Sequence, residues 1–187
     1  MRGVKFINAM RPIIALIALF FSHLSYGGDL YKLRVGLVWQ YELEGAEQKV
    51  AKNSIIRSVV VNEVEWFELS EYGERFWVRN TEQGQVEAVN FFDRDIDLSE
   101  PAEEVLIFKH PASVGETWGR PNSPTSYLGL REVTVPAGTF NCHMYRFDLN
   151  AGAFSESCIA EEIGVVVNRF KRSDGSTEVS KLSRYEK

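Results

Sequence analysis

The residues of this chain whose types and spacing most clearly predict a chemical bond are two cysteines, Cys142 and Cys158. The basic and apolar residues at the N-terminus, described below, predict export, and two cysteines in an exported protein most often form a disulfide. The segments 140–149 and 154–159 have the composition of a strand and its return. Centring their turn at Asn150 places Cys142 directly opposite Cys158, where the two Cα atoms come within bonding reach. We therefore predict a structural disulfide between Cys142 and Cys158.

A second group of polar residues imitates a calcium-binding loop. Asp93, Asp95 and Asp97 stand at alternate positions, and Glu104 occupies the twelfth position. However, Leu98 takes the place where such a loop needs glycine, and a strand rather than a helix precedes the segment. Three alternating aspartates are more simply the hydrated face of a strand that ends in an acidic loop. We expect no metal site here.

The residue pattern does not predict a catalytic centre. The chain has no Gly-x-Ser-x-Gly motif and no Cys-x-x-Cys motif. Beyond the N-terminal region its histidines are His110 and His143. His143 follows Cys142, but successive strand residues face opposite ways, so we expect His143 at the sheet surface rather than in a catalytic pair. Adjacent glutamates such as Glu161 and Glu162 rarely share a site. The prediction is a protein that is not an enzyme and that needs no cofactor.

The N-terminus has the features of a secretory signal peptide. Three basic residues fall among the first eleven, the apolar run Ile13–Phe21 follows, and small residues stand at Ser25 and Gly27. The run is shorter than the roughly 20 apolar residues that a transmembrane helix needs. We predict that residues 1–27 are cleaved near Gly27, and that 28–187 is a single antiparallel β domain in the periplasm. An uncleaved N-terminal anchor is the alternative.

The charge of the mature chain limits its partners. The full chain has 21 basic and 26 acidic residues; removing the three basic residues of the signal leaves 18 against 26, a net charge of −8 with neutral histidines. This balance argues against nucleic acid and against anionic lipid headgroups as main partners. The mature chain contains no further segment that could form a transmembrane helix.

The apolar pattern predicts an all-β fold. In Leu33–Leu43, the odd-numbered residues form an apolar face that includes Leu37, Trp39 and Tyr41. No stretch of the mature chain sustains an apolar period of 3.6 residues. About ten strands joined by short turns form an antiparallel meander, which we expect to curl into a half-barrel or an open barrel. The strands after the first are expected at 55–61, 64–72, 75–81, 86–93, 104–109, 127–135, 140–149, 154–159, 164–171 and 177–185, with a loop over 111–124.

Aromatic doublets occur on three successive predicted strands, at 66–67, 76–77 and 91–92. Neighbouring strand residues point to opposite faces, so both faces of the sheet carry aromatic side chains. A turn at Gln83-Gly84 would place Phe76 opposite Phe91. One face must be core, and the other either is covered or lines a cavity. The candidate ligand-binding residues are Leu37, Trp39, Tyr41, Trp66, Phe76, Trp77 and Phe91.

Four segments together resemble a known group of proteins. They are His110-Pro-Ala-Ser-Val-Gly-Glu-Thr-Trp118, Val133-Thr-Val-Pro-Ala-Gly-Thr-Phe140 with Cys142, Gly164-Val-Val-Val167, and Leu182-Ser-Arg-Tyr185. The chain resembles exported bacterial β-proteins of unassigned function with a Val-Pro-Ala-Gly-Thr-Phe corner. These in turn are similar to lipoprotein carriers of the LolA/LolB type. The resemblance implies a half-barrel sheet.

Two functions fit these observations. The first is a non-catalytic periplasmic domain that binds an apolar ligand, such as a lipid acyl chain, in its curled sheet. The alternative is a structural or partner-binding protein of the cell envelope with a filled core and no ligand. The aromatic side chains on both faces favour the first.

Overall fold

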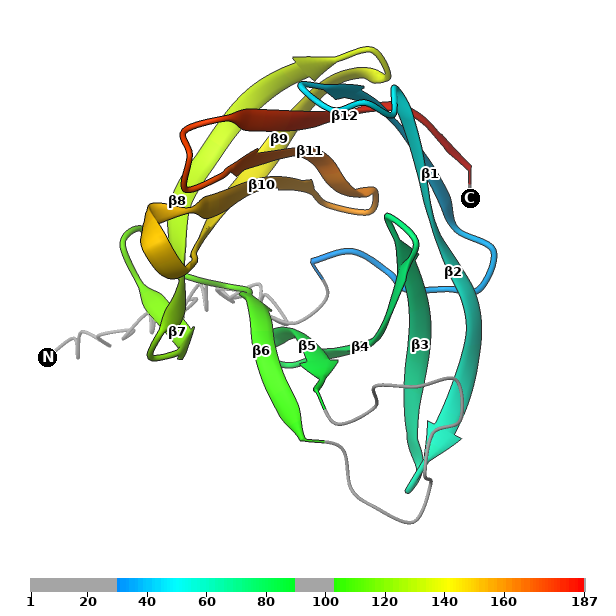
Figure 1. Ribbon diagram of the computed structural model, residues 1–187. Coiled ribbons are helices and arrows are strands. Elements are labelled where there is room, and N and C mark those ends of the chain that lie inside the picture. The colour runs from blue at the N-terminus through cyan, green and yellow to red at the C-terminus, as the bar shows by residue number, and fades with distance from the viewer. Residues whose placement is uncertain (1–29, 90–102, 187) are drawn as a thin grey trace, which may run out of the picture.

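A computed structural model describes residues 30–89 and 103–186. Twelve antiparallel strands form one sheet that curls into a nearly closed barrel (Figure 1). The predicted all-β meander of about ten strands is therefore confirmed. The strands are β1 (Val38–Glu44), β2 (Val50–Val61), β3 (Val64–Glu71), β4 (Glu74–Thr81), β5 (Gly84–Ala88), β6 (Glu104–Lys109), β7 (Thr117–Arg120), β8 (Ser123–Val135), β9 (Gly138–Asp148), β10 (Phe154–Ala160), β11 (Gly164–Lys171) and β12 (Thr177–Glu186).

The strand order shows how the chain closes on itself. It is β6-β5-β4-β3-β2-β1-β12-β11-β10-β9-β8-β7, so the first and last strands pair in the middle of the sheet. The chain runs from β1 to one edge, β6, and continues at the other edge, β7. Because the sheet curls, these two edge strands approach each other, and the indole N–H of Trp118 donates to the carbonyl of Ile107 at 3.4 Å. We call the line between β6 and β7 the seam.

Strand limits follow the local sequence closely except near glycines. The predicted limits of β6 and β11 agree with the structure. In contrast, the first strand begins at Val38 and not at Leu33, because Gly36 takes a φ of +91° that breaks the extended backbone. Val35 consequently lies 52% exposed instead of on the apolar face. The expected loop over 111–124 contains the short strand β7.

The turn between β4 and β5 differs from the prediction by two residues in register. Thr81 pairs with Gly84 and Val78 pairs with Glu87, whereas the predicted turn would have paired Val78 with Val89. Phe91, the predicted partner of Phe76, lies outside the described residues. Gly84 is a strand residue rather than a turn residue. A Cβ at this position would lie 1.9 Å from the carbonyl oxygen of Phe108 on β6. The glycine therefore serves the close approach of the neighbouring strand.

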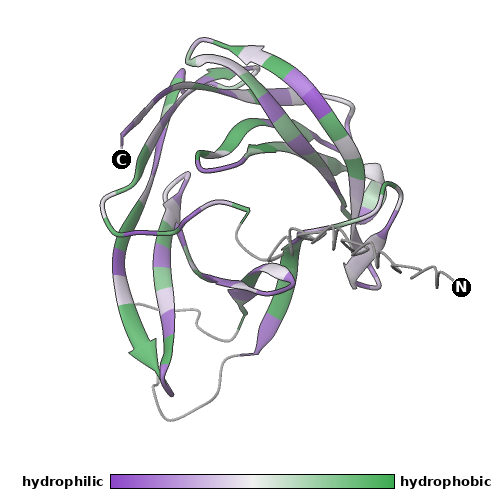
Figure 2. Ribbon diagram, turned by 180° about the vertical axis from the view of Figure 1, so that it is seen from behind, coloured by the Kyte–Doolittle hydropathy of each residue, from purple (hydrophilic) through white to green (hydrophobic). Residues whose placement is uncertain are grey.

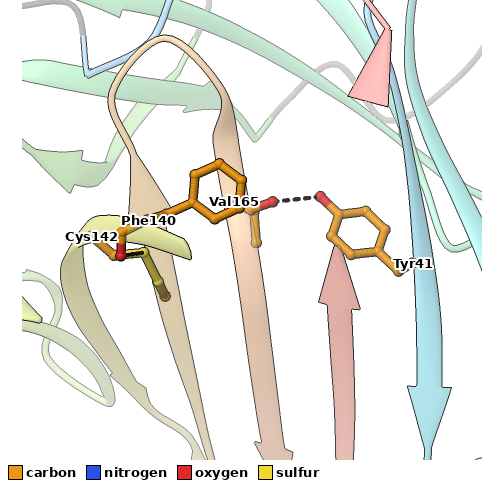
Figure 3. The surroundings of a disulfide bond; sticks show 5 residues. Tyr41, Phe140, Cys142 and Val165 are labelled. Atoms are coloured by element: carbon orange, nitrogen blue, oxygen red, sulfur yellow. Dashed lines mark hydrogen bonds between the residues drawn. A yellow bond between two sulfur atoms is a disulfide. The ribbon is translucent and has the colours of Figure 1, made fainter. Parts of the chain in front are cut away.

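The disulfide between Cys142 and Cys158 is confirmed, but the strand register that predicted it was wrong. Cys142 pairs with Ala160 on β10, so the two cysteines lie diagonally, with 5.2 Å between their Cα atoms. The turn is centred on Ala151 in the 3-10 segment Asn150–Gly152, and not on Asn150. The observed pairing differs from the predicted one by two residues. Because alternate strand residues share a face, both cysteines still lie on one face of the sheet. Figure 3 shows the disulfide beside Phe140.

The main hydrophobic core draws buried residues from β1, β2, β6 and β8 to β12. Polar and apolar residues alternate along the strands (Figure 2), as half-buried strands require. Trp39 and Tyr41 on β1 are almost fully buried, and their polar atoms are satisfied. The Trp39 indole donates to the carbonyl of Ile163 at 2.6 Å, and the Tyr41 hydroxyl donates to the carbonyl of Val165 at 2.8 Å (Figure 3). These bonds fasten β1 to the strand two places away, across β12.

A second, smaller cluster forms on the other face of β2 to β6. It is built from Trp66 and Trp77, 1% and 3% exposed, with Val61, Val86 and Ala88. Beside it, the buried carboxylate of Glu68 pairs with the guanidinium groups of Arg57 and Arg75. Arg57 also lies 5.3 Å from the centre of the Trp77 ring. The aromatic side chains on the two faces of this sheet therefore belong to two separate clusters.

Candidate ligand-binding site

A cavity of about 320 Å³ lies inside the barrel. Its wall is drawn from β3 to β6 and from β8 to β11, so the curl of the sheet forms it rather than one face alone. Its apolar residues include Leu69 on β3, Phe76 and Val78 on β4, Phe108 on β6 and Phe147 on β9. Tyr31 and Val165 contribute further apolar surface. Apolar side chains with a few convergent polar groups are typical of a small-molecule site.

Two smaller hollows adjoin this cavity. One, of about 230 Å³, shares Ser155 and Asn168 with it and extends toward Tyr72 and Phe170. The other, of about 130 Å³, lies along the seam and shares Glu87, Ile107, Ser123 and Phe147. The seam therefore borders directly on the cavity wall. A larger hollow of about 460 Å³ elsewhere is lined largely by charged and polar side chains such as Lys32, Glu65 and Arg79, and is less suited to an apolar ligand.

Two carboxyl groups, Glu71 on β3 and Glu87 on β5, face the cavity. Burial, with the charges of Glu87 and Glu74, raises the pKa of Glu71 to about 7. Burial also raises the pKa of Glu87, an effect that Arg120 opposes. The Asn53 amide donates to the Glu71 carboxylate at 3.3 Å. The cavity therefore holds acidic groups that favour their protonated form more than exposed carboxylates do.

Neutral polar groups complete the lining. The Asn168 amide donates to the hydroxyls of Ser155 and Ser157, each at 3.0 Å. Gln85 is 1% exposed, and its Nε2 has no hydrogen-bond partner within the described part of the chain. Buried amide N–H groups are seldom left without an acceptor. Gln85 thus offers a donor that a bound polar group could satisfy.

The predicted ligand-binding residues do not form one site. Phe76 lines the cavity, whereas Leu37, Trp39 and Tyr41 belong to the packed core beside it. Trp66 and Trp77 lie in the cluster on the other sheet face. Phe91 falls outside the described residues, as do the acidic segment 93–97 and the signal peptide 1–27.

Sequence reasoning missed the polar members of the lining. Glu71 and Glu87 share the cavity face with Leu69 and Val78, as strand alternation requires. If Phe76 faces the cavity, strand alternation places Glu74 and Val78 of β4 on the same face. Placing Glu87 there also requires the correct pairing between β4 and β5. Their aromatic character made Trp39, Trp66 and Trp77 candidate ligand-binding residues, but these side chains pack in the hydrophobic clusters.

His143 is also placed differently from the prediction. Its side chain is 12% exposed and not at the open sheet surface. The Nδ1 atom of His143 lies 2.9 Å from the hydroxyl of Tyr127 on β8, and the ring packs edge-on against His110 with 4.7 Å between centres. Strand alternation correctly predicted that His143 and Cys142 point to opposite faces of β9. The face that carries His143 is covered because the sheet curls.

Two solved structures align with most of the chain. A protein from Bacteroides fragilis, described as exported with a YmcC-like fold, aligns with a TM-score of 0.50 and 11% identity, over 84% of this chain and 98% of that chain. A protein from Parabacteroides distasonis, described as a lipoprotein, aligns with a TM-score of 0.42 and 9% identity over the same shares. The first likeness concerns the fold alone.

Sequence comparison adds no relative: neither a protein-family profile nor a curated protein matches the chain. The resemblance to lipoprotein carriers and the significance of the Val-Pro-Ala-Gly-Thr-Phe corner stay predictions. Within residues 30–89 and 103–186, no helix is both long and apolar enough to cross a membrane.

Proposed function

We propose that the protein is a non-catalytic component of the cell envelope that binds one small apolar or amphipathic molecule inside its barrel. The cavity formed by the curl of the sheet, with its aromatic and aliphatic wall, is the observation that carries this proposal. Ligand sites usually range from about 300 to 1,000 Å³. A cavity of about 320 Å³ is at the small end of that range. It suits a single acyl chain or a compact apolar molecule better than a lipid with several chains.

The polar part of the lining narrows the chemistry of this ligand. Glu71, Glu87 and the amide of Gln85 stand among apolar residues. A protonated or partly charged carboxyl group pairs best with a ligand that carries a hydroxyl or amine. A ligand with an apolar body and one such polar group would satisfy both kinds of surface. A strongly anionic headgroup would meet two carboxylates and is disfavoured.

The proposed location of the protein is the periplasm. The N-terminal signal and the Cys142–Cys158 disulfide both favour an oxidising, exported location. The exported protein from Bacteroides fragilis with the same fold is consistent with it.

A cavity-filling substitution tests the proposal. Val78 lines the cavity and is 1% exposed, whereas Val60 on β2 is 64% exposed. Val78→Phe should occupy the space that a ligand needs, and it should weaken the binding of the neutral fluorophore N-phenyl-1-naphthylamine at least tenfold. Val60→Phe makes the same chemical change outside the cavity and should leave binding within a factor of two. Fluorescence titration measures both.

The same pair of variants separates the proposal from a filled structural core. If the interior is empty, the new ring of Val78→Phe has room, and the melting temperature should fall little. If side chains already fill it, overpacking should cost about 1–3 kcal/mol of stability. A wild-type protein that binds no apolar probe, together with a destabilised Val78→Phe variant, would establish the structural alternative instead.

A further inference from the structure

Three potential metal ligands converge outside the set of residues that line the cavity. They are His110, His143 and Glu161, and one ligand atom from each lies within 4.8 Å of the other two. The Nε2 atom of His143 lies 3.4 Å from a carboxylate oxygen of Glu161. We refer to these three residues as the histidine cluster.

Three separate elements bring these residues together. His110 follows β6, and its backbone N–H donates to the carbonyl of Gln83 at 2.9 Å. His143 is a residue of β9 and pairs with Ile159 on β10. Glu161 begins the turn from β10 to β11 and is the exposed member. Because 32 and 17 positions separate them, no local spacing motif could reveal the cluster from sequence.

We propose that the histidine cluster binds a divalent transition-metal ion through two imidazoles and one carboxylate. In a tetrahedral zinc site the metal–ligand bonds are about 2.0–2.2 Å, so neighbouring ligand atoms stand roughly 3.4 Å apart. The His143–Glu161 distance already has this value. His110 must approach by about an ångström, a movement that side-chain rotation supplies.

The surroundings of the histidines favour metal binding. In a metal site, the second ring nitrogen of a ligating histidine is normally held by a hydrogen bond, which fixes the tautomer. Tyr127 supplies this contact at Nδ1 of His143, which leaves Nε2 directed at Glu161.

Mixed nitrogen and oxygen ligands select a borderline metal. Imidazole suits zinc, copper and nickel, whereas calcium and magnesium prefer oxygen ligands alone. Zinc is the natural probe because it accepts two imidazoles and a carboxylate in tetrahedral geometry. The cysteines do not compete for the ion, since both are in the disulfide. With three protein ligands, a fourth position remains for water or for a further group.

An ion held here would join the end of the edge strand β6 to β9 and to the β10–β11 turn. It would therefore fasten one end of the seam. A metal that binds the folded protein alone raises the melting temperature, and the rise grows with the logarithm of the metal concentration once that exceeds the dissociation constant. This inference is independent of ligand binding in the cavity, and Val78→Phe should leave the metal affinity unchanged.

The test is a calorimetric titration of zinc chloride into the exported protein, with its disulfide intact and bound metals first removed by a chelator. We expect one zinc ion per chain. Glu161→Gln, in which an exposed side chain loses its charge without disturbing the fold, should weaken binding at least tenfold. Glu162→Gln removes the same charge from the next position of the same turn and should change the affinity less than threefold.

Two further measurements make the outcome decisive. His143→Gln should also lose zinc, and cobalt(II) added to the wild type should give the intense visible absorption of a four-coordinate site, which Glu161→Gln abolishes. If wild type, Glu161→Gln and Glu162→Gln bind zinc with equal affinity, the ion is held by scattered surface carboxylates and the proposal is wrong. Absence of saturable zinc binding by the wild type overturns it as well.

Discussion

The acidic residues of the barrel interior show how burial alters the chemistry of a single side chain. Glu71 is partly exposed to the cavity, yet its pKa rises to about 7 because it is removed from bulk water and lies near the charges of Glu87 and Glu74. In the folded protein Glu71 therefore keeps its proton between about pH 4.5 and pH 7, where the unfolded chain releases it. The folded state binds more protons in this window, so its stability falls as pH rises.

We predict that the wild type loses on the order of 1–3 kcal/mol of stability between about pH 5 and pH 8, because Glu71 must ionise within the barrel. The raised pKa of Glu87 acts in the same direction. Glu71→Gln cannot ionise and should show a much flatter dependence. Urea unfolding at a series of pH values measures the free energy directly.

The control for this prediction is Glu42→Gln. Glu42 is an exposed residue of β1, so its replacement removes one charge while the decline with pH should persist. A wild type that is more stable at pH 8 than at pH 5 would contradict the assignment, as would a Glu71→Gln variant with the slope of the wild type.

At the scale of the elements, the hairpin of β9 and β10 depends on both hydrogen bonding and its disulfide. Strand pairing already holds Cys142 and Cys158 on adjacent strands, with a sequence separation of 16 residues. The bond therefore acts chiefly on the unfolded chain, where it closes a short loop. Both cysteines are fully buried, which protects the bond from reductants while the protein is folded.

Removing the disulfide should lower the free energy of unfolding by about 3 kcal/mol, the value for a loop of this length in the chain-entropy model. The double variant Cys142→Ala/Cys158→Ala, compared with the wild type in urea, measures this loss. Its hairpin should persist, because the backbone ladder does not need the bond. Two titratable thiols in native wild-type protein from the periplasm would contradict the pairing.

Sequence patterns predicted the elements better than their registers. Strand composition located β6 and β11, and the parity argument placed both cysteines on one face. The register of a hairpin depends on the residue at the centre of its turn. Between β9 and β10 that residue is Ala151, which has a positive φ, and not the predicted Asn150. Gly84 suggested a turn although its role is to admit the backbone of Phe108. Such long-range contacts leave no local signal in the sequence.

The histidine cluster and the cavity illustrate the same limit for sites. His110, His143 and Glu161 meet because the barrel curls, and neither composition nor periodicity expresses that curl. The cavity carboxylates Glu71 and Glu87 lie on the strands beside Phe76, so finding them required the strand registers as well as the inward direction of Phe76, and both came from the folded sheet.

The whole molecule is a barrel with a single interruption along its described strands, the seam between β6 and β7. The sheet ends on these strands, and their mutual contacts come from side chains rather than from a backbone ladder. The Trp118 indole bonds to Ile107, and Lys109 pairs with Glu116. The Tyr145 hydroxyl also donates to the carbonyl of Lys109 at 2.9 Å. Side-chain contacts alone leave the seam as the weakest line of the wall.

We predict that amides of β6 and β7 exchange with deuterium faster than those of β2, β3, β9 and β10. Edge strands lack a second partner, and local opening along the seam needs no ladder to break. Trp118→Phe keeps the aromatic ring and removes the indole N–H that reaches Ile107. Exchange in β6 should then accelerate further while exchange in β2 stays as it was. Hydrogen exchange followed by mass spectrometry resolves these segments.

Trp66→Phe provides the matched control, because it makes the same change on the other face of β3, far from the seam in strand order. It should leave exchange in β7 unchanged. Because the hollow along the seam shares Phe147 and Ile107 with the cavity, local opening there would give a ligand a route into the cavity. Trp118→Phe should therefore speed both uptake and release of the apolar probe, with little change in its affinity. Protection of β6 and β7 equal to that of β2 and β3 would mean that the barrel is closed as firmly at the seam as elsewhere, and that a ligand must enter through one of its ends.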